Sequence, residues 1–331
     1  MEEKDIKKQN KETKQSKKIE KVIEQPKQEL ADKPYYERIE DERKAFYGSF
    51  ITNRRISYIL MFITLVIAAG VMFMLTRDKE KYPYFQYIGW AVAGVSLVAM
   101  LIYFFTTKKK QPEKGKKYIS SVVKQMNDRA FRDSAFSDMI FDEQQKITLE
   151  DLVGDGIYKD ASGIRSRNVV KGIYNGHHFL YGEAALMRIQ TNRKQQTPPL
   201  FVGKYISMPN ELDFNGRIII VNKNAKQPVD LPNDIEDLEI LEEKENFVVY
   251  GPKDMGFRKY LRKEIVASIE TINLDAHLLN LNVVFWKGHS AAYLSYDDDL
   301  MSIPFEKAFD HVAFEKSVDD AMVIFKALAG K

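Results

Sequence analysis

The sequence of 331 residues contains no cysteine. This absence excludes a disulfide framework, a zinc cluster held by thiolates, an iron–sulfur site and a cysteine nucleophile. Histidine is scarce, with 5 residues scattered along the chain. The sequence also has no Walker A loop and no G-x-G-x-x-G, G-x-S-x-G or H-E-x-x-H motif. We therefore expect no cofactor, and the pattern favours a protein without enzymatic activity.

Charge is divided unevenly along the chain, although the formal net charge is only +3. Residues 1–117 carry 24 Lys and Arg against 15 Asp and Glu, a net charge of +9. Residues 118–331 carry 26 against 32, a net charge of −6. The basic part predicts contact with anionic lipid. The acidic part has no recognition motif, and it predicts no binding of nucleic acid.

Residues 1–50 form a first segment that is rich in Lys, Glu and Gln and poor in large apolar residues. Such a segment buries too little surface to offset its ordering entropy, which predicts a disordered arm. Its first 30 residues hold nine Lys against seven acidic residues. The arm is therefore either a solvated tail or a basic segment that touches anionic lipid or RNA.

Two uncharged apolar runs follow, at residues 56–76 and 85–107. At about 1.5 Å per residue, each is long enough for a hydrocarbon core of roughly 30 Å. The runs predict a transmembrane hairpin within residues 51–107. Neither run contains Asp, Glu, Lys, Arg or His. Because transporters normally need such groups near the midplane of the membrane, we expect the hairpin to be an anchor.

The orientation of the hairpin follows from the basic residues around it. Four precede the first run within residues 43–55, three lie in the loop at residues 77–84, and six follow within the linker 108–117. This bias predicts a two-span cell-membrane protein with both termini in the cytoplasm. The lysines of the linker either attract anionic headgroups or only fix this topology. They are Lys108, Lys109, Lys110, Lys114, Lys116 and Lys117.

Small residues share one face of the second run, at Gly89, Ala93 and Ser96. Their spacing allows another helix to approach closely. The face would serve either an interface between copies of the chain or packing against residues 68–70 of the first run.

Residues 118–331 are expected to form a cytoplasmic α+β domain with a largely antiparallel sheet, because short strand-like runs precede helical ones. Apolar spacing predicts an amphipathic helix over residues 118–136 and a long helix over 254–273. Ser317 and Asp320 predict the start of a C-terminal helix. Turn signals separate the expected strands. These are residues 169–174, 178–181, 185–190, 200–207, 217–221, 247–250, 282–286 and 291–296.

Several of these stretches together resemble a family of uncharacterised bacterial membrane proteins, catalogued as domain of unknown function 3137. The resemblance covers roughly residues 56–310 and depends on the order and spacing of five segments. It implies two N-terminal spans and a cytoplasmic α+β domain, no established activity, and a membrane partner of the LemA type. The five segments are Ile147–Tyr158, Val170–Glu183, Leu200–Val221, Phe247–Ile269 and Val283–Phe305.

Two groups of polar residues are candidate sites in the domain. His177, Glu183 or the run Asp297–Asp299 could hold a metal ion. However, His177 and Glu183 would lie about 20 Å apart along one strand. The second group is a basic stripe on the expected helix 254–273, which either docks to an acidic partner or lipid headgroups or is a solvated face. It comprises Arg258, Lys259, Arg262 and Lys263.

The leading hypothesis is a non-enzymatic, membrane-anchored cytoplasmic module that scaffolds or regulates a membrane protein complex. Its expected partners are an anionic bilayer, an unidentified membrane protein and other copies of the chain. The alternatives are a membrane-anchored, metal-assisted hydrolase and a module that senses anionic lipid.

Overall fold

The chain divides into two compact units in the computed structural model. The first, the helical unit, comprises Met1–Met126 and Phe305–Phe309, and the second, the sheet domain, comprises Asn127–Pro304 and Asp310–Lys331. Residues 35–50 of the expected disordered arm, residues 1–50, are helical instead, and residues 1–32 lie outside the described residues. These are 33–77, 83–141, 146–153, 156–158, 160–188, 199–225, 238–253, 256–259, 261–272, 274–275, 277–296 and 306–329.

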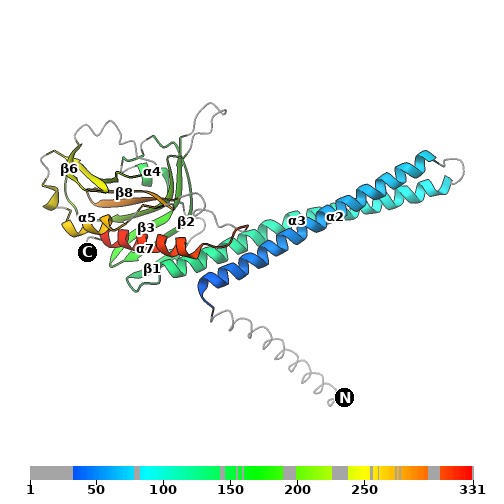
Figure 1. Cartoon of the computed structure of the whole chain (residues 1–331), viewed down its shortest axis with the longest axis horizontal. Helices are drawn as coiled ribbons and strands as arrows, with labels where there is room; N and C mark the ends of the chain where they lie inside the picture. Colours follow the sequence, from blue (N-terminus) through cyan, green and yellow to red (C-terminus); the bar gives the residue numbers. More distant parts are fainter. Residues whose placement is uncertain are drawn as a thin grey trace, which may run out of the picture. The chain divides into compact units, whose positions relative to one another are not determined.

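Two long helices, α2 (Tyr35–Arg77) and α3 (Pro83–Ala130), lie side by side in the helical unit (Figure 1). The rings of Phe46 and Tyr118 stack with centroids 4.9 Å apart. Further along, the hydroxyl of Tyr103 donates to the carbonyl of Asn53 at 3.4 Å. Residue numbers rise along one helix as they fall along the other, so the helices are antiparallel. The helix expected over residues 118–136 is therefore the continuation of α3, and it ends at Ala130 rather than at residue 136.

One helix in the described part of the chain is long and apolar enough to cross a membrane, over Tyr35–Val71. It contains most of the first expected span. The second expected span, residues 85–107, lies within α3, where the apolar stretch Trp90–Phe105 is shorter. The chain thus has a long N-terminal apolar helix that could anchor it in a membrane, and the second span stays a prediction.

The sheet domain is built on one antiparallel sheet, whose nine described strands have the order β1-β2-β3-β4-β9-β8-β5-β7-β6. Together with its helices it confirms the predicted α+β class with a largely antiparallel sheet. The strands are β1 (Phe136–Phe141), β2 (Gly163–Tyr174), β3 (His177–Met187), β4 (Phe201–Pro209), β5 (Arg217–Asn222), β6 (Leu238–Glu243), β7 (Phe247–Pro252), β8 (Leu278–Trp286) and β9 (His289–Tyr296).

Turn residues fix the register of the β2–β3 and β8–β9 hairpins. Asn175 and Gly176 join β2 to β3 with φ angles of 49° and 87°, which is the geometry of a type I′ turn. Gly288, with φ of 72°, joins β8 to β9. In this second hairpin Trp286 pairs with His289. Side chains near both turns consequently have fixed positions on the sheet.

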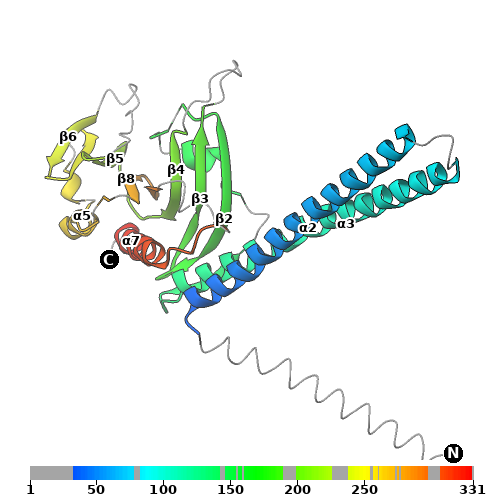
Figure 2. The same ribbon diagram turned by 45° about the vertical axis from the view of Figure 1, so that its right-hand side comes forward.

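The two faces of the sheet support separate cores. On one face, α5 (Lys263–Glu270) and α7 (His311–Leu328) cover a core that includes Ile206 and Met208 of β4 (Figure 2). On the other face, α4 (Leu149–Val153) contributes to a core that includes Tyr205 of β4. Alternation along one strand thus separates the cores.

Three expected elements differ from the structure. The helix over residues 254–273 is wrong, because Arg262 has an extended backbone and separates a 3₁₀ turn, η1 (Phe257–Lys259), from α5. Residues 178–181 and 185–190 were expected as two strands, but residues 178–181 and 185–187 belong to the single strand β3, which ends at Met187. Residues 189 and 190 lie outside the described ones. The C-terminal helix begins after Asp310, whose carboxylate accepts from the backbone N–H of Ala313 at 3.0 Å.

Candidate functional site

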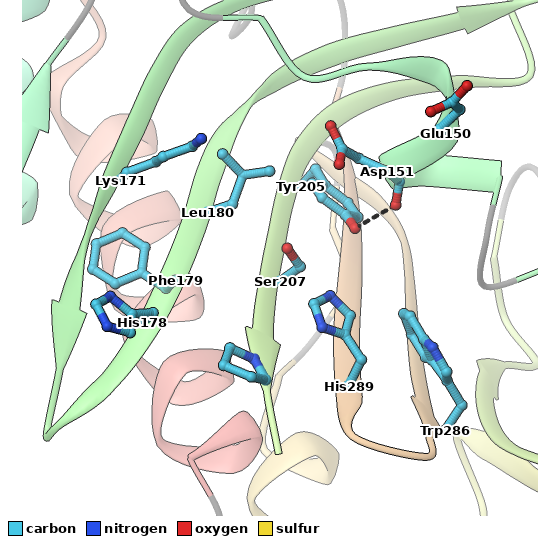
Figure 3. Close-up of a pocket in the computed structure, with 11 residues that line it drawn as sticks. Glu150, Asp151, Lys171, His178, Phe179, Leu180, Tyr205, Ser207, Trp286 and His289 are labelled. Atoms are coloured by element: carbon cyan, nitrogen blue, oxygen red, sulfur yellow. Dashed lines mark hydrogen bonds between the residues drawn. The ribbon is translucent and has the colours of Figure 1, made fainter.

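The sheet face that carries α4 has an open groove of about 460 Å³ beyond the end of that helix (Figure 3). This volume lies in the range typical of ligand pockets. The groove is lined by Glu150, Asp151, Lys171, His178, Phe179, Leu180, Tyr205, Ser207, Pro209, Trp286 and His289.

Strand register brings these residues together from distant parts of the sequence. Leu180 of β3 pairs with Ser207 of β4. His289 of β9 pairs with Pro209 on one side and with Trp286 on the other. Because paired residues of neighbouring strands share a face, their side chains form two adjacent rows across the sheet. The groove therefore runs across the strands.

The acidic wall of the groove is the short helix α4. The side chain of Asp151 accepts hydrogen bonds from the backbone N–H and the hydroxyl of Thr148, at 2.7 and 2.8 Å. The hydroxyl of Tyr205 donates to the carbonyl of Asp151 at 2.8 Å, as Figure 3 shows. The buried hydroxyl of Tyr293 donates to the carbonyl of Leu152 at 2.7 Å. Two tyrosines of the sheet therefore fix the position of α4.

Aromatic and imidazole rings line the groove beside the turn between β8 and β9, as Figure 3 shows. The rings of Trp286 and His289 lie 4.7 Å apart between centroids. Burial lowers the pKa of His289, and the carboxylate of Asp151 only partly opposes this shift. The imidazole is consequently neutral at pH 7, with one donor and one acceptor nitrogen. The groove can thus bind both an apolar group and a polar group of a ligand or partner.

The residues of the predicted metal site do not come together. Glu183 is buried in the opposite face of the sheet, where it accepts from Arg167 at 2.5 Å. His178 lies in β3, as expected of residues 178–181, and lines the groove. Asp297–Asp299 lie outside the described residues. In the part of the chain that the structure describes, no three His, Asp or Glu residues could hold one metal ion.

The predicted basic stripe does not lie on one helix. Arg258 and Lys259 belong to η1, Arg262 precedes α5, and Lys263 is its first residue. The guanidinium of Arg258 is paired with the carboxylate of Glu242. The four residues are therefore not the continuous helical face that the spacing predicted.

The linker and the small-residue face are described only in part. Residues 108–117 are helical within α3, and Lys114, Lys116 and Lys117 are exposed. The side chains of Lys108, Lys109, Lys110, Gly89 and Ala93 lie outside the described ones.

Residues 68–70 of α2, the predicted packing partner of the small-residue face, have open space around them. A Cβ atom added to Gly70 would meet nothing within 4 Å, and Ala68 and Ala69 are exposed. Ser96 is half-buried. Close packing at Gly70 is thus not seen among the described residues, and the interface between copies of the chain stays a prediction.

A buried cluster that the sequence did not predict lies on the α7 face of the sheet. The Nζ atom of Lys204 donates to the hydroxyl of Ser317 at 2.6 Å and lies 5.4 Å from the ring centre of Tyr296. Glu183 is the cross-strand neighbour of Lys204, and Asp320 of α7 also faces it. We call these five residues the Lys204 cluster.

Burial dominates the ionisation of the Lys204 cluster. It lowers the pKa of Lys204 to about 8, against the opposing effect of Glu183 and Asp320. It also raises the pKa of Asp320 to about 6 and raises the pKa of Glu183. Because every one of these shifts disfavours the charged form, the charges are costly for the fold.

Comparisons with known proteins give a distant structural likeness. No family model and no curated protein matches the chain. Among solved structures, the crystal structure of the mycobacterial trehalose monomycolate transport factor A, TtfA, is similar with a TM-score of 0.35 and 12% sequence identity. The match covers 62% of this chain and 94% of that chain.

Proposed function

We propose that the chain is a non-enzymatic, two-span membrane protein whose cytoplasmic sheet domain scaffolds or regulates a membrane protein complex. The observation that carries the membrane part is the distribution of exposed apolar side chains. Nine large exposed hydrophobic residues lie on α2 between Ile56 and Phe73, and ten lie on α3 between Tyr87 and Phe105. Only five others are exposed in the described part of the chain. Such patches on a water-soluble surface would be unfavourable.

The two apolar stretches also lie at the same level. Phe46 stacks on Tyr118 in the antiparallel pair. Ile56, ten residues further along α2, is thus level with roughly residue 108, and Phe73 with roughly residue 91. The exposed stretch of α3, from Tyr87 to Phe105, therefore agrees with the stretch of α2 to within about four residues, or about 6 Å, at each end. This agreement supports one hydrocarbon slab that both helices cross.

The absence of cysteine allows a clean test of this topology. Single substitutions Asp213→Cys in the sheet domain and Lys79→Cys between the spans introduce one thiol each. An impermeant maleimide should label Lys79→Cys in right-side-out vesicles and Asp213→Cys only in inverted ones. Labelling of both positions from one side would contradict the two-span arrangement.

For the partner-binding part, the groove is the surface we propose. Its preformed shape and mixed polarity suit a segment of a membrane protein, which the family resemblance suggests could be of the LemA type. A photo-crosslinking amino acid at Leu180 should capture a partner in membranes. The same amino acid at Ile240, an exposed residue of the edge strand β6, is the matched control.

The crosslink at Leu180 should disappear when Trp286→Ala removes the aromatic end of the groove. Identical crosslinked products from Leu180 and Ile240 would contradict a specific role of the groove.

A further inference from the structure

We infer that five exposed cationic side chains of the helical unit form a binding surface for the phosphate headgroups of anionic phospholipids. The inference rests on the membrane anchoring proposed above. We call this surface the basic collar. It consists of Arg54, Arg55, Lys114, Lys116 and Lys117.

The basic collar lies directly outside the apolar stretches. Arg54 and Arg55 immediately precede Ile56, where the exposed apolar side chains of α2 begin. On α3, Lys114 follows Phe105 by nine residues, or about 14 Å of helix. A headgroup layer is about 6 Å thick on each side of the hydrocarbon core, and attraction persists over a Debye length of about 8 Å. Lys116 and Lys117 lie further out, about 17 and 18 Å from Phe105, but helical side chains lean toward the N-terminal end of α3, here toward the bilayer. Cations of both helices therefore reach the headgroup layer or the region within one Debye length of it.

Basic and acidic residues occupy different levels of the α2–α3 pair. On α2 no acidic residue lies between Lys44 and Ile56, and on α3 Glu113 is the one acidic residue between Phe105 and Tyr118. Acidic side chains instead gather further from the apolar stretches. They are Glu37, Glu40, Asp41 and Glu42. Positive charge is thus concentrated where the headgroups of the bilayer would lie.

The direct contacts of the basic collar are with neutral groups, and the carboxylate of Glu306 acts on Arg54 only over a longer range. The Nε atom of Arg54 donates to the hydroxyl of Tyr58 at 3.3 Å, and its guanidinium lies 5.6 Å from the centre of that ring. The Nζ atom of Lys114 lies 3.4 Å from the hydroxyl of Ser49. These partners are neutral, and within the described ranges none of the five cations forms an ion pair with a carboxylate.

The position of the collar favours lipid over other polyanions such as RNA. Tyr58, whose hydroxyl accepts the hydrogen bond of Arg54, is 57% exposed and lies at the edge of the apolar stretch. Amphipathic rings at such an edge are typical of the membrane interface. A nucleic acid would have to approach cations that adjoin an apolar surface buried in the bilayer.

The test uses the full-length chain, purified in mild detergent and mixed with equal amounts of phosphatidylglycerol and phosphatidylcholine. Native mass spectrometry counts each lipid retained per protein. We expect a several-fold excess of phosphatidylglycerol, which the triple variant K114Q/K116Q/K117Q reduces roughly fivefold or more. The matched control K124Q/K146Q/K326Q removes three exposed lysines elsewhere and should retain the excess. Added salt should weaken the preference.

Equal retention of the two lipids by the unmodified chain, or the same ratio in both variants, would overturn the collar. Displacement of phosphatidylglycerol by single-stranded RNA would assign the cations to nucleic acid and also overturn it. Flotation of the chain with phosphatidylcholine vesicles tests the anchor separately. If the chain floats but does not prefer phosphatidylglycerol, only the collar proposal is contradicted. If the chain does not float, the proposed membrane anchor is contradicted as well.

Discussion

Replacing Asp320 with asparagine should stabilise the sheet domain at neutral pH. The side chain of Asp320 is 11% exposed, and its Oδ2 atom accepts no hydrogen bond within the described residues. The nearest ammonium to this oxygen, that of Lys316, is 3.9 Å away. Asparagine has nearly the same shape but carries no charge to desolvate.

The magnitude follows from the pKa of Asp320, which burial raises from 3.8 to about 6. A rise of roughly two units corresponds to about 3 kcal/mol lost on ionising the folded protein. Removing the charge avoids this loss, but the variant also loses the attraction between the carboxylate and the ammonium groups of Lys204 and Lys316. We therefore expect Asp320→Asn to raise the free energy of unfolding by about 1 to 2 kcal/mol at pH 7.

The effect should depend on pH in a defined direction. Well below pH 3.8, the ordinary pKa of this group, the carboxyl is protonated in both the folded and unfolded states, and the variant should have little advantage. Between about pH 4 and 6 the folded protein binds more protons than the unfolded chain, so its stability falls as pH rises. The advantage of Asp320→Asn should therefore grow across this window and stay constant above it.

Urea unfolding of the full chain in detergent provides the assay. The chain has 2 tryptophans. Substituting Trp90→Phe leaves Trp286 as the only reporter, and it lies in the sheet domain. Asp319→Asn, which changes the exposed neighbour in α7, is the control and should have little effect. A loss of stability in Asp320→Asn at pH 7, or a gain that persists unchanged at pH 3.5, would refute the reasoning.

Two further substitutions test the packing of the sheet. Lys204→Met should lower the free energy of unfolding by about 3 kcal/mol, because Ser317 loses its donor and the nearby carboxylates lose their cation; a neutral result in the same urea assay would contradict this. Gly203→Ala should cost about 3 kcal/mol or more, since a Cβ atom there would lie 1.9 Å from the backbone carbonyl oxygen of Leu294. Gly48→Ala has open space, and thermal unfolding should show no loss for this control.

The apolar runs and the fold class could be predicted because their signals are local. Continuous hydropathy requires no knowledge of partners, and neither does the Asn175-Gly176 turn, whose type needs two positive φ angles. The antiparallel sheet followed from short strand-like runs separated by such turns. These parts of the prediction depend on residues that are close in sequence.

Elements that depend on distant partners were harder to predict. Gly182 and Glu183 look like a break between two strands, but a Cβ atom at Gly182 would lie 2.8 Å from Ile147, and Arg167 neutralises Glu183. Both residues therefore fit within the continuous strand β3. Similarly, Leu261 and Ile265 reach the core as their spacing predicted, although the backbone between them is not one helix.

The groove could not be predicted, because strand order alone brings its residues together. Ser207 and His289 lie more than eighty positions apart in the sequence and become neighbours only because β4 pairs with β9. The one local signal is polarity: Ser207 and His289 interrupt strands that are otherwise rich in apolar residues. A single sequence does not reveal on which face such an interruption lies or what faces it.

The two tyrosine hydroxyls behind α4 have a consequence for how readily the groove can bind. A helix of five residues has almost no stability of its own, so the order of α4 is supplied by Tyr205 and Tyr293 of the sheet. The acidic wall is thus assembled before any partner arrives, and little chain entropy remains to be lost on association. The rigidity of the binding surface therefore originates in phenol groups behind α4, on strands that fold for other reasons.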